Sequence, residues 1–464
     1  MDHKTLYQLK MKKYLFILFT LFGCSLSFGQ SFEGTWEGSL EIQGMELPLV
    51  FELKYDGEWK GTMQSPKQSK QKAPLSSIKA SADSIYIEMK MIGLKYAGKL
   101  SPDKQAIDGI IQQGGLKAPM RMLKKDPATI VTDFPKVRSQ KVAPPYSYDT
   151  LDIQFPNTAE KIKLAGTITK PKGEGRYPAV VLVNGSGPLD RNSAMYGHEP
   201  FKVLADYLTK QGIVVLRYDE RGVGKSEGDF KTATSADLGK DALAAIKYLR
   251  TQSNVDPKKV GIVGHSEGGL ISFLLAGQRI AGLDYIVSLA GPAIRIDSLM
   301  ILQNEALAKN SGTTIDPKQL AMIKRNYEIA KSNLSTEKAF EAIMTNMKVI
   351  PGSQEADFAD QIAVLITPWY RYFLKIDPTT FIRKIKVPVF AAYGGKDVQV
   401  TSTENLESLT DNLPKHPKNE IKLYPNLNHL MQPAKTGGIG EYPEIPISLD
   451  TELMKDITNW IKAL

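Results

Sequence analysis

The pattern of hydrophobic and polar positions divides the chain into two parts. Between Phe32 and Lys125, short segments alternate apolar and polar residues and are separated by turn signals. The segments are TWEGSLEI, ELPLVFELKY, EWKGTMQS, SIYIEMKM, LKYAGKL, AIDGIIQQ and APMRMLKK. Alternation over such lengths is typical of strands with one buried face. It predicts a small all-β domain over residues 31–125, an antiparallel barrel or sandwich of six to eight strands.

From residue 149 onward, apolar runs alternate with helical stretches. The runs are LDIQFP, KLAGTITKP, AVVLVNG, IVVLRYD, VGIVGH, YIVSLAG, VPVFAAYG and EIKLYPN. Helices are expected at 199–211, 235–252, 267–279, 402–413 and 450–463. Nearly continuous β-branched runs joined by helices indicate an α/β fold, with a mostly parallel sheet covered on both faces. The first two runs alternate more strongly and are expected to form antiparallel edge strands.

Two further segments complete this organisation. Residues 126–148 are rich in Pro and Lys and are interpreted as a linker before a domain at 149–464. Residues 291–386 separate two of the predicted strands, far more than a simple crossover needs, and their composition favours helices. We predict a helical cap at about 296–385, over the carboxyl edge of the sheet, whose apolar residues form chiefly a core of their own.

The first 29 residues are typical of an export signal. Three lysines, Lys10, Lys12 and Lys13, precede the apolar run YLFILFTLFGCSLSFGQ, which is shorter than the roughly 20 residues of a membrane span. We therefore expect a signal peptide at 1–29 and a periplasmic or extracellular protein. The only cysteine, Cys24, lies in this run, within a sequence that resembles a bacterial lipoprotein box. Simple cleavage and lipidation of Cys24 both stay open.

Charge and composition narrow the classes of partner. The formal net charge is +9, but basic and acidic residues are mixed, with no arginine-rich stripe between aromatics. This disfavours a nucleic-acid partner, and no stable protein partner is inferred. The β domain contains no histidine or cysteine, so we expect a structural or carbohydrate-facing role for it. Trp36 and Trp59 could stack on a sugar, although such aromatics are more often part of a core.

The segment Gly264–Gly268, GHSEG, matches the pattern G-x-S-x-G. It follows a predicted strand and opens a predicted helix, and this context gives the pattern its meaning. Glycines on both sides allow a sharp turn that exposes the hydroxyl of Ser266 at the carboxyl edge of the sheet. The helix N-terminus would favour negative charge that develops nearby. An ordinary Gly-rich turn is the alternative, but we interpret Ser266 as a nucleophile.

A serine nucleophile needs a base, and the chain has few histidines to offer. They are His3, His198, His265, His416 and His429. His3 leaves with the signal peptide, His265 is expected to point to the opposite face of its strand, and His416 lies in a polar loop. His198 is expected near the mouth of the site, with a substrate-binding or structural role. His429 follows the last predicted strand, so we predict that it is the base.

The remaining candidate groups are the acid and the oxyanion donors, and we expect them near the ends of strands. Asp397 closes the strand VFAAYG and is the predicted acid, ahead of Asp411 in a helix and Asp377 before a proline. An oxyanion needs two N–H donors. We expect one from the backbone of Glu267 and the other from the loop NGSGPLDRN, where Ser186 is preferred and Gly185 comes next, the latter also as a substrate contact.

One other glycine-containing loop, DERGVGKS at 219–226, follows a predicted strand. It lacks the spacing of a phosphate-binding P-loop, so phosphate binding is not expected. We interpret this loop as a support for the floor of the site.

Together, GHSEGG, YDERGVGKS, NGSGPLDRN, the strand end YGGKD and the late NLNH resemble the α/β-hydrolase superfamily. The resemblance is to bacterial serine esterases of the serine aminopeptidase-like or S33-type group and to thermophile-type esterases with an N-terminal β domain. It covers about residues 149–464 and implies an α/β-hydrolase fold, an eight-stranded sheet and a triad of Ser266, Asp397 and His429 with no metal or organic cofactor. The Asn184 start of the oxyanion loop departs from the usual histidine-glycine start, which leaves the second donor open.

The resemblance alone does not fix the substrate. The leading hypothesis is an exported serine carboxylesterase that hydrolyses small to medium acyl esters through an acyl-enzyme. One alternative is a serine peptidase that cleaves short peptides or aminoacyl amides, with Glu267 or Glu355 holding the substrate amine. An alternative of another class is a catalytically inert, glycan-binding surface protein. Acyl preference and oligomeric state cannot be derived from the sequence.

Overall fold

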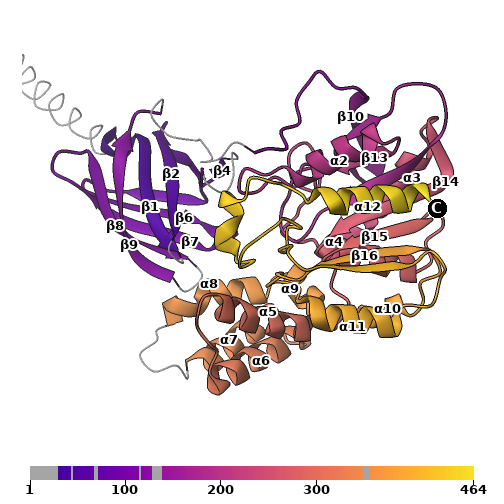
Figure 1. The fold of residues 1–464 in the computed structure, drawn as a ribbon. Coiled ribbons are helices and arrows are strands. Elements are labelled where there is room, and N and C mark those ends of the chain that lie inside the picture. Colours follow the sequence, from indigo (N-terminus) through magenta and orange to yellow (C-terminus); the bar gives the residue numbers. More distant parts are fainter. Residues whose placement is uncertain (1–29, 43–44, 67–71, 114–115, 128–137, 349–354) are drawn as a thin grey trace, which may run out of the picture. The chain divides into compact units, whose positions relative to one another are not determined.

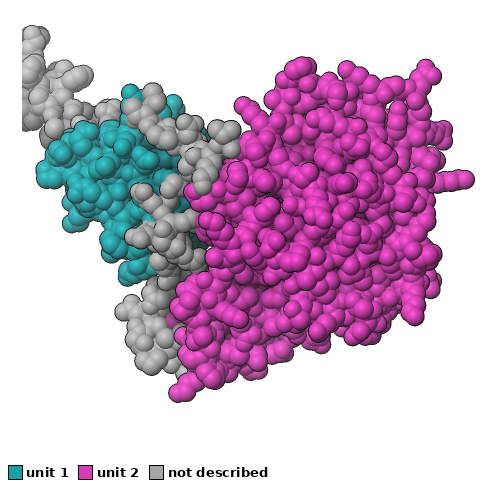
Figure 2. Space-filling model, in the orientation of Figure 1, with its two compact units in different colours: residues 1–132 teal, residues 133–464 magenta. Residues whose placement is uncertain are grey.

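The computed structural model describes residues 30–464 except 43–44, 67–71, 114–115, 128–137 and 349–354 (Figure 1). The expected signal peptide and the middle of the expected linker therefore lie outside the described residues. The chain divides into two compact units, residues 1–132 and 133–464 (Figure 2). In the described ranges, no helix combines the length and the apolar character that a membrane crossing requires.

The first unit is a curled sheet of nine antiparallel strands. In chain order they are β1 (Gly34–Ile42), β2 (Met45–Tyr55), β3 (Trp59–Gln64), β4 (Ala73–Pro74), β5 (Ser77–Ala80), β6 (Ser84–Met89), β7 (Leu94–Leu100), β8 (Ala106–Gln113) and β9 (Leu116–Lys125). Their order in the sheet is β4-β3-β2-β1-β9-β8-β7-β6-β5. The two edges approach each other, since the side chain of Ile78 in β5 packs over Gly61 in β3.

The predicted strand count of six to eight was too low, because β4 and β5 are too short to show alternation. Inside the curl, Trp36 is fully buried and its Nε1 donates to the carbonyl oxygen of Phe32 at 2.8 Å. Trp36 is therefore a core residue and not a sugar-stacking platform. The ring of Trp59 is half-buried and lies 5.2 Å from the ring of Tyr55.

The second unit is built on an eight-stranded sheet. Its strands are β10 (Asp149–Asn157), β11 (Ile162–Lys170), β12 (Tyr177–Val183), β13 (Val214–Tyr218), β14 (Val255–His265), β15 (Tyr285–Leu289), β16 (Val389–Gly394) and β17 (Glu420–Tyr424). Their order is β10-β11-β13-β12-β14-β15-β16-β17. β10 and β11 pair antiparallel at one end, and β12 to β17 run parallel. Each strand coincides with one of the eight apolar runs.

Helices cover both faces of this sheet. The five expected stretches form α2 (Pro200–Lys210), α3 (Ser235–Arg250), α4 (Glu267–Gly277), α11 (Ser402–Asn412) and α12 (Thr451–Lys462). Because side chains alternate along a strand, Val180 and Leu182 of β12 pack with α2 and α12, whereas Val181 and Val183 pack with α3, α4 and α11. Two cores therefore hold the sheet, one on each face.

A helical cap is inserted between β15 and β16. It contains α5 (Ile296–Asn310), α6 (Pro317–Lys331), α7 (Thr336–Met347), α8 (Glu355–Leu365) and α9 (Pro368–Phe373), followed by the short α10 (Thr379–Ile382). Figure 1 shows α5 to α8 gathered into one bundle. Residues such as Tyr327, Ile343 and Tyr370 give this bundle a core of its own. The short α10 instead packs on α4, where Gly277 accepts the close approach of Phe381.

The end of the predicted linker is part of the second unit. Arg138 donates to backbone carbonyl groups at Tyr196 and Pro443, and Tyr148 donates to the Asp206 carboxylate at 2.9 Å. The prediction of a linker over all of 126–148 was therefore wrong for its last part. The composition of the segment could not indicate this packing, because many of these contacts are made to backbone atoms.

Candidate active site

A strained turn carries Ser266 between β14 and α4. Its backbone lies at φ 54° and ψ −117°, a conformation that costs a residue with a Cβ atom on the order of 1–2 kcal/mol. A Cβ atom at Gly264 would overlap the carbonyl oxygen of Gly268, and one at Gly268 would overlap that of Val183. The two glycines therefore let the turn pack against its own helix and against β12.

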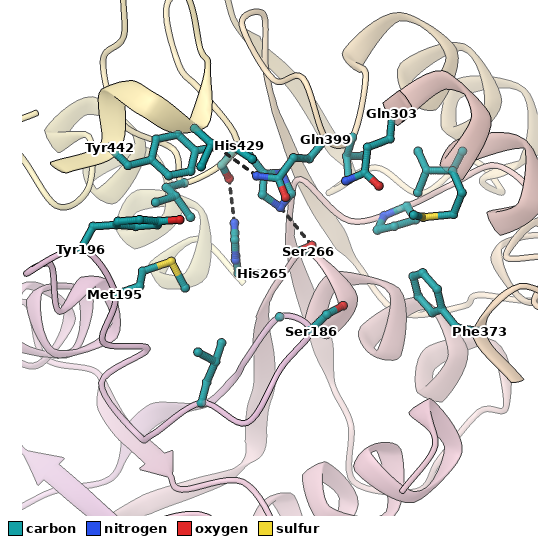
Figure 3. Close-up of a pocket in the computed structure, with 18 of the residues that line it drawn as sticks. Ser186, Met195, Tyr196, His265, Ser266, Gln303, Phe373, Gln399, His429 and Tyr442 are labelled. Carbon is teal, nitrogen blue, oxygen red and sulfur yellow. Dashed lines mark hydrogen bonds between the residues drawn. The ribbon is translucent and has the colours of Figure 1, made fainter. Parts of the chain in front are cut away.

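The structure brings together the three residues predicted as a triad, and Figure 3 shows two of them, Ser266 and His429. Nε2 of His429 lies 3.1 Å from Oγ of Ser266, and its Nδ1 lies 2.8 Å from Oδ2 of Asp397. The other carboxylate oxygen of Asp397 accepts from the backbone N–H groups of Gln399 and Val400 at 2.7 and 2.8 Å. The carboxylate is thus fixed, and it orients an imidazole whose Nε2 faces the serine hydroxyl. This is the arrangement in which an imidazole can accept a proton from serine.

The side chain of His265 lies in the site, contrary to the expectation that it points away. Its Nε2 lies 2.7 Å from the carbonyl oxygen of His429, and the two rings are 4.9 Å apart. Burial and the neighbouring His429 lower the pKa of His265 to about 4, so at neutral pH it is uncharged and its N–H can donate to that carbonyl. Strand alternation failed here because His265 is the last residue before the turn. Its contact with the carbonyl oxygen of His429 connects the turn at Ser266 to the loop that carries His429.

The residues predicted for the oxyanion hole surround Ser266. Glu267 is the first residue of α4, so its N–H has no acceptor within the helix. Gly185 and Ser186 both line the pocket, and a Cβ atom at Gly185 would lie 3.2 Å from Cβ of Ser266. Their roles as N–H donors stay predictions.

The carboxylate of Glu267 has a function that the sequence did not suggest. It is buried and accepts from Oγ of Ser235 at 2.6 Å and from Nε1 of Trp369 at 2.9 and 3.1 Å. The hydroxyl of Ser186 donates to it as well. Burial raises the pKa of Glu267, and the three hydrogen bonds oppose that rise. One carboxylate therefore joins the start of α3, the cap helix α9 and the loop beside Ser266.

A cavity of about 290 Å³ opens beside Ser266 (Figure 3). Most of its lining is apolar, from Leu189, Met195, Pro292, Leu299, Met300, Trp369, Phe373, Val400, Leu430 and Ile439. Its polar lining consists of Ser186, Tyr196, His265, Gln303, Gln399 and Tyr442, together with Ser266 and His429. Among the residues that the structure describes, none of those lining the cavity is Asp, Glu, Lys or Arg. Within the described ranges, no three His, Cys, Asp or Glu side chains are grouped so that they could hold a metal ion.

His198 does not line this cavity, which corrects its expected substrate-binding role. It is 1% exposed, with Nδ1 at 3.0 Å from Oγ of Ser448 and Nε2 at 2.9 Å from the carbonyl oxygen of Tyr442. Burial lowers the pKa of His198 to about 4. The aromatic residues near it, Tyr196 and Tyr442, line the cavity instead. The sequence placed the segment correctly but could not show which of its side chains turns inward.

The loop at 219–226 is connected to neighbouring segments by arginine–carboxylate pairs. Arg191, from the loop after β12, makes a two-pronged contact with Asp219 at 2.9 and 2.7 Å. Arg221 makes a similar contact with Asp241 of α3 at 2.7 and 2.9 Å. Two-pronged pairs of this kind hold an arginine side chain in a fixed geometry. The loop is thus a structural support, as its sequence context suggests.

Comparison with known proteins agrees with this geometry. The family model for serine aminopeptidase, S33, matches residues 198–432. Esterase EstD of Thermotoga maritima is 29% identical over 310 residues, which cover 64% of this chain and 65% of EstD. The uncharacterized peptidase YuxL of Bacillus subtilis is 28% identical over 135 residues, 27% of this chain and 20% of YuxL. The chain thus spans less than two thirds of the length of either relative.

Solved structures also resemble the chain. A Pyrococcus furiosus esterase is 18% identical, with 70% of this chain and 97% of that chain covered and a TM-score of 0.42. The family match spans the turn at Ser266, the cap, Asp397 and His429, on a sheet with α/β-hydrolase topology. The chain therefore belongs to the serine aminopeptidase S33 family of α/β-hydrolases.

Proposed function

We propose that the protein is a serine ester hydrolase in which Ser266 is the nucleophile, His429 the base and Asp397 the orienting acid. The observation that carries the proposal is the hydrogen-bonded order Ser266–His429–Asp397, with distances of 3.1 and 2.8 Å, at the wall of a cavity. The esterase name of EstD supports an ester as the substrate.

The proposed reaction has two stages. Ser266 Oγ attacks the ester carbonyl carbon while His429 Nε2 takes its proton, and the backbone N–H of Glu267 with a donor from Gly185 or Ser186 stabilises the oxyanion. His429 then protonates the leaving alcohol, and an acyl-enzyme remains. Water, deprotonated by His429, attacks this acyl group, and Ser266 recovers its proton as the acid leaves.

The cavity lining supports a neutral substrate. An apolar acyl group loses water-exposed surface by entering such a cavity, whereas a charged group would be desolvated there without a partner of opposite charge. We therefore propose small to medium acyl esters as substrates.

The aminopeptidase alternative needs a carboxylate that can bind a substrate ammonium group. Glu267 does not offer one, because its carboxylate is buried and already accepts from Ser235, Trp369 and Ser186. The side chain of Glu355 lies outside the described residues. Parallel assays on p-nitrophenyl acetate and an aminoacyl p-nitroanilide test the choice, and a dominant amide preference would reverse it.

The triad is tested by Ser266→Ala. Because the hydroxyl is the attacking group, we expect kcat for p-nitrophenyl acetate to fall by about 10³–10⁶ while the protein stays folded. Circular dichroism and the thermal midpoint check the fold, and a fluorophosphonate probe should label the parent protein at Ser266 but not the variant. Near-normal turnover by the variant would refute the proposal, and failure of the folded parent to react with the probe would favour the inert, glycan-binding alternative.

We further propose export, on the basis of the lysines and the apolar run before Gln30. Mass spectrometry of the mature N-terminus distinguishes its two forms. A start at Gln30 or Ser31 indicates simple cleavage, whereas a diacylated Cys24 indicates a lipoprotein.

A further inference from the structure

Two tyrosines form one wall of the cavity. Figure 3 shows Tyr196 and Tyr442 on the opposite side of Ser266 from Phe373. Their rings meet nearly edge to face, with centroids 5.6 Å apart and an interplanar angle of 73°. The hydroxyl of Tyr442 accepts from Nε2 of Gln399 at 3.0 Å. We call this ring pair the tyrosine wall, and a substrate group that extends from Ser266 in this direction meets it.

The loop that carries Tyr196 has an unfavourable backbone. Ser193 and Tyr196 have φ values of 54° and 51°, in the left-handed region that residues with a Cβ atom rarely adopt. Such conformations persist only where the surrounding structure holds them. The position of the tyrosine wall therefore depends on contacts from outside the loop.

Arg138 makes contacts of this kind on both sides of the wall. Its Nη2 donates to the carbonyl oxygen of Tyr196 at 2.5 Å and to that of Pro443 at 2.9 Å. Its Nη1 donates to the carbonyl oxygen of Ile445. The rigid planar guanidinium group has several donors in fixed directions, so one side chain can join the two backbone segments.

The residues next to Arg138 extend this attachment. The side-chain amide of Gln140 donates to the carbonyl oxygen of Leu449 at 2.7 Å and accepts from the N–H groups of Ser448 and Leu449 at 2.8 and 3.0 Å. The N–H of Ser139 donates to the carbonyl oxygen of Pro446 at 3.0 Å. We call residues 138–140 the strap. It lies outside the strands and helices of the hydrolase fold, before β10.

We infer that the strap, through Arg138, positions the tyrosine wall and so sets the selectivity of the cavity for the substrate group bound on that side of Ser266. Arg138 is a positioning residue in this inference, because it touches backbone carbonyl groups and not the cavity. The inference rests on the proposed ester hydrolysis. It gives a defined function to a segment whose composition resembles that of a linker.

The test compares Arg138→Ala and Arg138→Lys with Lys141→Ala, an exposed control three residues along the full-length chain. Two ester series are used. In the first, p-nitrophenyl acetate, butyrate and octanoate vary the acyl group. In the second, methyl, benzyl and 1-naphthyl acetate vary the alcohol. If one wall of the cavity is displaced, only the substrate group that contacts this wall should bind differently.

We expect both Arg138 variants to change the ratio of kcat/KM between the largest and smallest members of one series by about 5- to 20-fold, a size typical of an altered pocket contact. The ratio in the other series should change by less than about twofold, and Lys141→Ala should leave both unchanged. Lysine should not rescue, because one ammonium group cannot reproduce the geometry of a guanidinium fork. Equal changes in both series, or none, would overturn the inference while leaving the proposed ester hydrolysis intact.

Hydrogen exchange in the full-length variants gives a readout that needs no substrate. The amides of 193–198 and 439–449 should exchange faster in Arg138→Lys than in the parent protein, and unchanged protection would overturn the inference. Gln140→Ala, which removes contacts only to Ser448 and Leu449, should act in the same direction more weakly and serves if Arg138→Ala does not fold. If the parent protein hydrolyses none of the esters, the proposed function fails, and the exchange result still decides whether the strap holds these loops.

Discussion

The backbone of Glu267 lies beside Ser266, whereas its side chain contacts the cap. Its backbone N–H is a proposed oxyanion donor, and its carboxylate accepts from Trp369 in α9 and from Ser186 in the oxyanion loop. In Glu267→Gln, an NH2 group replaces one of the two carboxylate oxygens. The glutamine side chain can then no longer accept hydrogen bonds from all three partners. We expect kcat to fall by about 10- to 100-fold, less than the loss of an entire oxyanion donor, and KM to change by less than about threefold.

A double-mutant cycle with Trp369→Phe separates this role from general destabilisation. The phenylalanine loses the indole N–H but can keep the stacked contact with Phe373, whose ring lies 5.0 Å from that of Trp369. Because the two mutations remove the same contact, their effects on kcat should not add. Strictly additive effects would show that Glu267 acts independently of the cap.

His198 gives the second unit a dependence on pH. Its folded-state pKa is about 4, below the ordinary value of 6.5, so the unfolded chain binds a proton more readily than the folded chain. The contribution of the neutral, buried imidazole to stability is therefore complete above about pH 6.5 and is lost as pH falls toward 4. A shift of this size corresponds to about 3 kcal/mol.

Between pH 7.5 and pH 4.5, we expect the free energy of unfolding to fall in both the parent protein and His198→Gln. The fall should be smaller in the variant, and the difference between the two falls should be about 2 kcal/mol. Denaturant titration at the two pH values measures both falls. The comparison with the variant removes the contributions of carboxylates that titrate in the same range. Equal falls in the two proteins would show that His198 is not the titrating group.

At the residue scale, the sequence was most informative where a side chain ends a strand. Asp397 and His429 follow strands whose carboxyl ends lie at one edge of the sheet, so their meeting with Ser266 could be anticipated from topology. The contacts of the Glu267 and His265 side chains were missed. They depend on which way a side chain leaves a sharp turn, and a strand or helix pattern does not extend through that turn.

At the element scale, the junction of β14 and α4 tolerates no added methyl group. In Gly264→Ala, the new Cβ atom would overlap the backbone of Gly268, which cannot move without displacing Ser266. We expect a loss of about 2–3 kcal/mol or more in unfolding free energy and loss of esterase activity. The control is Gly239→Ala in the middle of α3, where the nearest atoms are side-chain carbons at 3.9 Å.

The control should be neutral or stabilising by up to about 1 kcal/mol, because alanine is the better helix former. Thermal unfolding and p-nitrophenyl acetate turnover measure both variants. A stable, active Gly264→Ala protein would mean that the turn can be built in another way.

Element prediction succeeded and failed for physical reasons. Parallel strands such as β13 and β15 are buried on both faces and mostly apolar, so their sequences stand out. β4 and β5 cover two and four residues, which is too few to show a period. The strap was taken for a linker because the partners of Arg138 are backbone carbonyl groups, which no residue pattern reveals.

At the scale of the whole molecule, the two units have separate hydrophobic cores. Trp36 and its neighbours fill the curl of the first unit, whereas the second unit has a core on each face of its sheet and another in the cap. The α/β class was predicted from the order of strands and helices. The α/β-hydrolase fold, which the resemblance of the motifs implied, is confirmed by the family match. The curled sheet of the first unit followed the predicted alternation, but its described residues contain no cluster of catalytic side chains from which to derive its role.

The uncharged lining of the cavity has a consequence for how fast substrate arrives. Long-range attraction speeds association only where charges on the site and the ligand act on each other, and added salt screens such attraction. A neutral ester gains no such guidance here and reaches Ser266 by undirected diffusion. We therefore expect kcat/KM for p-nitrophenyl butyrate to vary by less than about twofold between 10 and 500 mM NaCl, measured at constant pH. A steep decline would mean that charges beyond the cavity rim draw the substrate in.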